Sequence, residues 1–116
     1  MRLYRLTIFI LSFTTILVAA SVVLAERRIA LVIGNGAYPN IGELTNPPND
    51  ARLMAGTLRS LGFEVIEEID VGQKPMKKAI KAFGDRLREA GKDAVGLFYY
   101  AGHGVQVDGV NYLVPI

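Results

Sequence analysis

Blocks of apolar and polar residues follow one another along residues 26–116, and they predict three strands. Ile29–Ile33 is a continuous apolar run closed by Gly34-Asn35-Gly36, which is typical of a strand buried on both faces of a parallel sheet. Residues 63–70 and 94–100 predict a second strand and a third, also buried, strand. The acidic residues of the second strand favour an edge position, because charge keeps a free edge from pairing with other chains.

Apolar residues at three- and four-residue spacing predict a helix after each of the first two strands. The first helix begins near Pro47–Asp50 and ends at Gly62, with an apolar face of Ala51, Met54, Leu58 and Leu61. The second has Pro75 in its first turn and ends at Gly91, with an apolar face of Met76, Ile80, Phe83, Leu87 and Ala90. Its basic residues are interpreted as a solvated face rather than a binding patch: Lys77, Lys78, Lys81, Arg86 and Arg88.

Residues 105–107 and 110–114 flank Asp108-Gly109, and an Asp-Gly pair between two alternating runs predicts a β-hairpin. Strands that alternate with helices of about a dozen residues predict an α/β fold, with a mostly parallel sheet and helices on both faces. Ligands of such sheets gather at the carboxyl ends of the strands. The loops 34–46 and Gly102–Gly104 are therefore the candidate site loops.

Residues 1–25 have the layout of a leader. Arg2 and Arg5 precede Leu6–Ala25, a run of twenty residues without a charge that ends in small residues before Glu26. A signal peptide cleaved after Ala25 is favoured over an uncleaved membrane anchor. We therefore expect residues 27–116 to be exported, periplasmic or secreted, or else anchored in the inner membrane outside the cytoplasm. Contact with the membrane is expected only through residues 6–25.

Charge and residue counts exclude several classes of function. Eleven of the 13 Lys and Arg residues lie beyond the leader, where they balance the 11 Asp and Glu, so nucleic acid is not an expected partner. The absence of cysteine excludes disulfides, thiolate metal sites and a catalytic cysteine within this chain. The single histidine excludes a multi-histidine metal site, and we expect no cofactor.

Gly34-Asn35-Gly36 invites comparison with the dinucleotide-binding fingerprint. Its third glycine position is Pro39 here, and the helix begins only near Pro47. Turn formation is therefore the favoured role of these glycines, and nucleotide binding is the less favoured hypothesis.

His103 is the sharper candidate, because it follows the third strand between two glycines and can serve as a general base. A structural role is the alternative. A histidine base needs a nucleophile, and the serines Ser12, Ser21 and Ser60 do not stand at strand ends.

Several short motifs together resemble the caspase-like cysteine peptidases, most closely the bacterial caspase and metacaspase-like branch. They are Gly34-Asn35 with Tyr38, Leu44, Asn49-Asp50-Ala51, and Tyr99-Tyr100-Ala101-Gly102-His103-Gly104 before the hairpin. The resemblance covers residues 27–116. It implies an α/β/α sandwich, cysteine endopeptidase activity and protein or peptide substrates. It also implies that His103 is the catalytic histidine and that the Gly104 N–H is an oxyanion-hole donor.

The sequence departs from the family in its nucleophile. The family's cysteine follows the histidine by about 50 residues, whereas this sequence ends 13 residues after His103. We expect residues 27–116 to be the N-terminal, large-subunit portion of a caspase domain, incomplete at its C-terminus and without peptidase activity alone. The alternative is a genuine short product, a non-catalytic binding or regulatory module that pairs through the exposed edge of its last parallel strand.

Overall fold

The central element of the fold is β1 (Arg28–Gly34), which pairs in parallel with β2 (Glu64–Ile69) on one side and with β3 (Val95–Ala101) on the other. The structure is a computed structural model that describes residues 25–116. The predicted leader lies outside the described residues apart from Ala25, which is exposed. No helix within residues 25–116 is both long and apolar enough to cross a bilayer. The parallel sheet and the edge position of β2 are confirmed.

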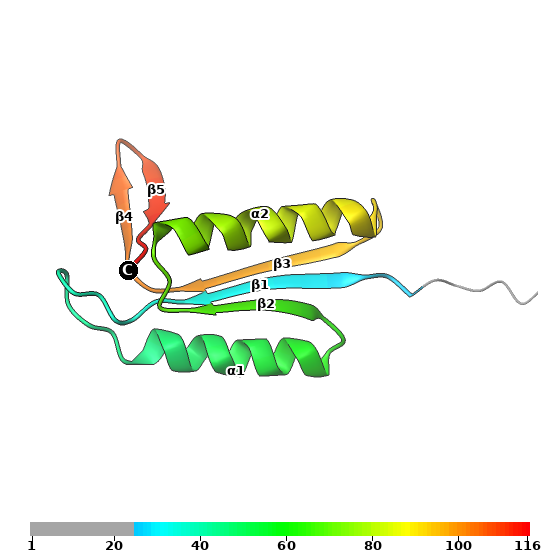
Figure 1. Cartoon of the computed structure of the whole chain (residues 1–116), viewed down its shortest axis with the longest axis horizontal. Coiled ribbons are helices and arrows are strands. Elements are labelled where there is room, and N and C mark those ends of the chain that lie inside the picture. Colours follow the sequence, from blue (N-terminus) through cyan, green and yellow to red (C-terminus); the bar gives the residue numbers. More distant parts are fainter. Residues whose placement is uncertain (1–24) are drawn as a thin grey trace, which may run out of the picture.

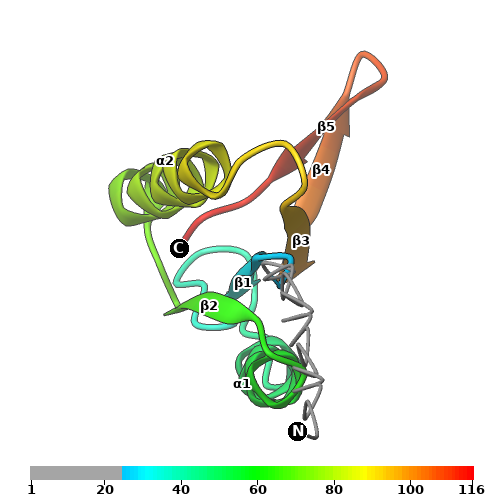
Figure 2. The ribbon, with the colours of Figure 1, turned by 90° about the vertical axis from the view of Figure 1, so that its right-hand side faces the viewer.

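Two helices cover the two faces of this sheet and produce three layers (Figure 1). α1 (Asn46–Ser60) connects β1 to β2, and α2 (Gln73–Ala90) connects β2 to β3. The chain steps from β1 to β2 and then back across β1 to β3, so two crossovers of the same hand place the helices on opposite faces. Viewed along the strands, α1 and α2 lie on either side of the sheet (Figure 2). The predicted α/β class is confirmed.

The five residues Ile29–Ile33 are fully buried, as their continuous apolar run predicts. Side chains alternate between the faces of a strand. Ala30 and Val32 therefore pack on the α1 side, in a cluster with Ala51, Ala55 and Leu58. Leu31 and Ile33 pack on the α2 side, in a cluster with Val71, Met76 and Ala79. The core consists of these two thin layers, one on each face of β1.

Gly34 and Gly36 are glycines because the start of α1 and the loop before it pack directly on their backbones. A Cβ on Gly34 would collide with the Pro47 carbonyl oxygen, and a Cβ on Gly36 would collide with that of Leu44. Neither glycine has a positive φ, although the chain does turn tightly after Gly36, where the Tyr38 N–H donates to the Gly36 carbonyl at 2.9 Å. The same packing fills the space beside these glycines, which removes the structural basis of the nucleotide hypothesis.

Two predictions about burial are wrong. β3 was expected to be a buried strand, but it lies at an edge of the described sheet, and Val95 and Phe98 are 38% and 48% exposed. Leu61 and Ile80 were assigned to the apolar helix faces, yet they are 56% and 44% exposed. An apolar residue is buried only if another element packs against it, and its own sequence does not determine which elements do so.

β4 (Gly104–Val107) and β5 (Val110–Leu113) form the predicted hairpin. Asp108 and Gly109 make the two-residue turn with φ of 50° and 78°, the positive values that a type I′ turn requires. The hairpin projects away from the sheet (Figure 2). Its apolar side chains are exposed, among them Val105, Val107 and Val110. The hairpin signal is confirmed.

Leu31→Ala is expected to lower the free energy of unfolding by about 2–4 kcal/mol, because it leaves a cavity in the layer under α2. Leu53→Ala is the matched control, since Leu53 is 73% exposed on α1 and its truncation creates no cavity. Urea unfolding of both variants measures the difference. Equal losses in the two variants would show that β1 is not the core of the folded chain.

Candidate functional site

Two loops meet where β1 and β3 end side by side. Gly34 is the register partner of Ala101, and the Asn35 N–H donates to the Ala101 carbonyl at 2.9 Å. The strand order reverses here, because the chain goes from β1 to β2 on one side of the sheet and then to β3 on the other side of β1. Open α/β sheets bind ligands at such a point, outside the carboxyl ends of the strands. The loop of residues 35–45 and His103, which follows β3, therefore lie together at the position that the fold favours for a site. Figure 1 shows the loop after β1 beside the end of β3.

The imidazole of His103 is held by the loop of residues 35–45. Its Nε2 lies 3.1 Å from the carbonyl oxygen of Gly42. Its ring packs edge-on against Tyr38, with ring centroids 4.6 Å apart and an interplanar angle of 61°. Because a carbonyl oxygen only accepts hydrogen bonds, Nε2 carries the proton of the neutral ring, and Nδ1 keeps its lone pair. Nδ1 is thus the nitrogen that can take a proton from a nucleophile.

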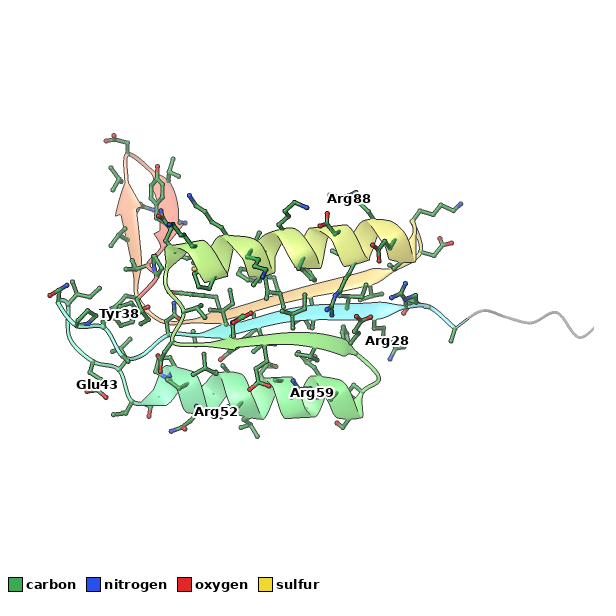
Figure 3. The ribbon with its side chains drawn as sticks, in the orientation of Figure 1. Arg28, Tyr38, Glu43, Arg52, Arg59 and Arg88 are labelled. Atoms are coloured by element: carbon green, nitrogen blue, oxygen red, sulfur yellow. The ribbon has the colours of Figure 1, made fainter. Side chains whose placement is uncertain are left out.

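The backbone of His103 is also paired at both ends. Its N–H donates to the Tyr38 hydroxyl oxygen at 3.0 Å. Its carbonyl accepts from the Tyr100 hydroxyl at 2.8 Å and from the Val114 N–H at 3.0 Å. Figure 3 shows Tyr38 at the end of the sheet to which the strand arrows point. Residues from three separate segments therefore fix the peptide that carries the imidazole.

Gly104 begins β4 and lies opposite Leu113 of β5. The hydrogen bond from the Val114 N–H to the His103 carbonyl shows which residue pairs of this antiparallel ladder are hydrogen-bonded. His103 and Val114 form such a pair, so the next pair, Gly104 and Leu113, does not. Successive residues of a strand direct their N–H groups to opposite sides, so the Gly104 N–H points away from β5. This orientation leaves the N–H open next to His103. Gly104 itself has room for a side chain, because an added Cβ would lie 3.5 Å from the Tyr112 carbonyl oxygen, an ordinary contact.

Gly102 has no such room. Its φ is 156°, and an added Cβ would lie 2.6 Å from the hydroxyl oxygens of both Tyr38 and Tyr100. A glycine before His103 is therefore what allows the two hydroxyls to approach the His103 peptide.

Two polar side chains, buried Asn35 and exposed Asp70, hold the backbone at the base of the site. Asn35 is fully buried, and its Oδ1 accepts from the Val71 N–H at 3.0 Å. Asp70 accepts from the N–H groups of Gly36 and Ala37 at 2.8 and 3.0 Å, and so anchors the start of the loop. The sequence pattern did not single out Asp70. Its position directly after β2, at the same sheet end as Asn35, is the signal that could have found it.

The resemblance motif Asn49-Asp50-Ala51 does not meet His103. Ala51 is buried next to Gly34. Asn49 and Asp50 are exposed in α1, and the Asn49 side chain bonds back to the Thr45 carbonyl at 3.4 Å. Within the described residues, this motif packs the start of α1 onto β1.

His103 has no nucleophile beside it within residues 25–116. The chain contains no cysteine. Ser60, the one serine in the described part, donates to the Thr57 carbonyl at 2.6 Å where α1 ends, at the opposite end of the sheet from His103. The geometry therefore presents a base and an open N–H without a group for them to activate.

Comparison with known proteins identifies the family of this arrangement. Residues 27–116 match the model of the caspase domain, a family of peptidases. The chain belongs to the caspase domain family. Mucosa-associated lymphoid tissue lymphoma translocation protein 1 of Homo sapiens and its homolog in Mus musculus are each 36% identical to it over 93 residues. Each match covers 80% of this chain but 11% of the relative.

The family resemblance and the caspase-like fold are thus confirmed. The assignment to the bacterial caspase and metacaspase-like branch is finer than these matches and stays a prediction. So do the roles of His103 and Gly104.

Tyr100 is the titratable group of this caspase domain whose pKa is most clearly displaced. Burial raises the pKa of its phenol well above the usual value of 10.0, and the adjacent Tyr38 hydroxyl adds to the shift. A phenolate at this place would face the carbonyl oxygens of His103 and Val114, which lie 2.8 and 2.9 Å away. Tyr100 therefore remains a neutral hydrogen-bond donor in the folded chain.

This shift predicts a stability change in alkali. A pKa raised by folding contributes stability that is present below the unfolded pKa of about 10 and is lost as pH rises through the folded pKa. Between about pH 9 and pH 11, the native chain should lose more stability than Tyr100→Phe does. Urea unfolding at the two pH values measures this. Tyr112→Phe, at a residue 51% exposed, should keep the native slope. Equal slopes for Tyr100→Phe and Tyr112→Phe would contradict it.

Proposed function

We propose that residues 27–116 supply the histidine half of the catalytic site of a caspase-type cysteine peptidase that cleaves protein or peptide substrates. The observation that carries this proposal is the imidazole of His103. Its Nε2 faces the Gly42 carbonyl, and its Nδ1 is left as the base, at the sheet end where α/β proteins bind ligands. Membership of the caspase domain family supports the same chemistry.

The proposed roles follow from the two available groups. Nδ1 of His103 takes the proton of a thiol, and the protonated ring then gives a proton to the leaving amine. The Gly104 N–H donates to the oxygen of the scissile carbonyl as negative charge develops on it. The thiol must come from outside these 116 residues, because they include no cysteine. The chain by itself therefore lacks peptidase activity in this proposal.

The test begins with the DNA that follows the codon for Ile116. The protein encoded with that extension is assayed on peptides ending in Arg, Lys or Asp, beside the 116-residue chain. We expect cleavage only with the extension. His103→Ala should lower turnover at least about a thousandfold, and Lys92→Ala, in the exposed turn before β3, should not change it. A clean stop after Ile116, or cleavage that survives His103→Ala, contradicts the proposal.

Gly104 allows a matched pair of variants in the same protein. Gly104→Pro removes the backbone N–H and should lower turnover by about 10²–10³. Gly104→Ala keeps the N–H and meets only an ordinary contact, so it should retain most of the activity. Equal losses in the two variants would remove Gly104 from the oxyanion hole.

We also propose that the domain is exported, on the strength of the uncharged run Leu6–Ala25 and the small residues before Glu26. Cell fractionation and the mass of the mature chain test this. Cytoplasmic protein that retains Met1 would contradict it.

A second candidate function is a non-catalytic binding module, and the face of β3 on the α2 side favours it. An apolar groove of about 290 Å³ lies there, between β1, β3, α2 and the hairpin. Its lining is Leu31, Ile80, Phe83, Phe98 and Leu113. Exposed apolar surface beside a free strand edge is the usual ground for pairing with another chain.

This candidate predicts that the 116-residue chain self-associates and that Phe98→Glu reduces its association. A charge in the groove opposes burial of that surface against a partner. Leu53→Glu, which places the same charge on an exposed residue of α1, should leave association unchanged. Sedimentation of the variants in mild detergent measures the difference. A sharp monomer for the native chain would count against pairing through β3.

A further inference from the structure

Two tyrosine hydroxyls enclose the peptide of His103. The Tyr38 oxygen accepts from the His103 N–H at 3.0 Å, and the Tyr100 hydroxyl lies 2.8 Å from the His103 carbonyl. The two hydroxyl oxygens are 3.1 Å apart, and both also contact the Val114 carbonyl, at 2.8 and 2.9 Å. Tyr38 is 5% exposed, so this cluster is shielded from solvent where it meets the loop.

The direction of each bond follows from the number of hydrogens. A phenol has one hydrogen, and a carbonyl oxygen only accepts. Tyr38 therefore gives its hydrogen to Val114 while it accepts from the His103 N–H. Tyr100 gives its hydrogen to the carbonyl oxygens of His103 and Val114, between which it lies. One tyrosine thus serves the N–H of the histidine peptide and the other serves its carbonyl.

Tyr38 also contacts the imidazole itself. Its ring packs edge-on against the ring of His103, with 4.6 Å between the ring centroids. Nε2 of the imidazole faces the carbonyl oxygen of Gly42, which belongs to the same loop as Tyr38. The ring of Tyr38 limits rotation of the imidazole away from the Gly42 carbonyl. Gly102 completes the arrangement, since any Cβ there would displace both hydroxyls.

We propose that Tyr38 and Tyr100 are positioning residues for His103: they hold its peptide at both ends and keep its Nε2 on the Gly42 carbonyl. This inference rests on the proposed function for its catalytic meaning, since a fixed imidazole is useful when Nδ1 must meet a thiol. The tyrosines touch no reacting atom in it. They act through the backbone and the ring of His103.

The test uses nuclear magnetic resonance on the 116-residue chain in mild detergent. The chain has one histidine, so isotope-labelled histidine gives one set of ring signals without overlap. Tyr38→Phe and Tyr100→Phe each remove one oxygen and keep the ring. Tyr99→Phe is the matched control, because Tyr99 is the neighbour of Tyr100 in β3 and packs on the α1 side of the sheet. Tyr38→Leu removes the ring contact as well.

We expect amide exchange at His103 to become about five- to tenfold faster in Tyr38→Phe, because its N–H loses its acceptor. Exchange at Leu31 and Val32 should stay at the native rate, which separates a local role from general destabilisation. The ring nitrogen signals should show one neutral tautomer, with the proton on Nε2, in the native chain and in Tyr99→Phe. In Tyr38→Leu and Tyr100→Phe they should show a mixture of both tautomers.

Native exchange at His103 and native ring signals in Tyr38→Phe, Tyr100→Phe and Tyr38→Leu would overturn the proposal. Equal acceleration at His103 and at Leu31 would also overturn it, by showing that the hydroxyls stabilise the fold in general. The measurement needs no substrate, so a failure of the catalytic role of His103 would appear in the peptidase assay and not here.

Discussion

Burial of β1 on both faces is the constraint from which the rest of the molecule follows. A strand of five fully buried apolar residues needs a cover on each side, and here α1 and α2 supply it. The same strand must have a hydrogen-bonded neighbour on each edge, and β2 and β3 supply those. β1 is the central strand, and the chain crosses over it on the way from β2 to β3. β3 therefore pairs in parallel with β1, and the carboxyl ends of these two strands lie side by side. That juxtaposition creates the site.

Immediately beyond β1, the buried residues are polar, so they need hydrogen-bond partners rather than an apolar cover. Asn35 is fully buried and Tyr38 nearly so, and neither can leave a donor or acceptor unpaired without cost. The Val114 carbonyl accepts hydrogen bonds from the hydroxyls of both Tyr38 and Tyr100. The Asp70 carboxylate accepts hydrogen bonds from the backbone N–H groups of Gly36 and Ala37 at the start of the loop. The loop that holds the imidazole is therefore fixed by hydrogen bonds as well as by packing.

The chain thus belongs to the caspase domain family, and its candidate site holds the imidazole of His103 on the Gly42 carbonyl without a thiol among the described residues. Some of its surface charges form ion pairs that involve β2. Glu64 of β2 meets Arg27 and Arg86, and Glu67 meets Arg59 of α1, which is labelled in Figure 3. The acidic strand that looked like a simple solvated edge is thereby tied to both helices. Exposed pairs of this kind contribute little stability each.

The sequence by itself determined the three strands, the two helices, the hairpin and the place of His103 at a strand end. These features depend on periodicity, proline, glycine and turn residues that act within a few positions of one another. Tertiary structure decided the tautomer of His103, the roles of Tyr38 and Tyr100, the anchoring by Asp70 and the exposure of β3. Tyr38 and Gly42 reach His103 from 65 and 61 residues away, and Asp70 reaches Gly36 from 34. Local pattern does not encode such partners, because they meet only after the sheet has brought distant loops to one edge.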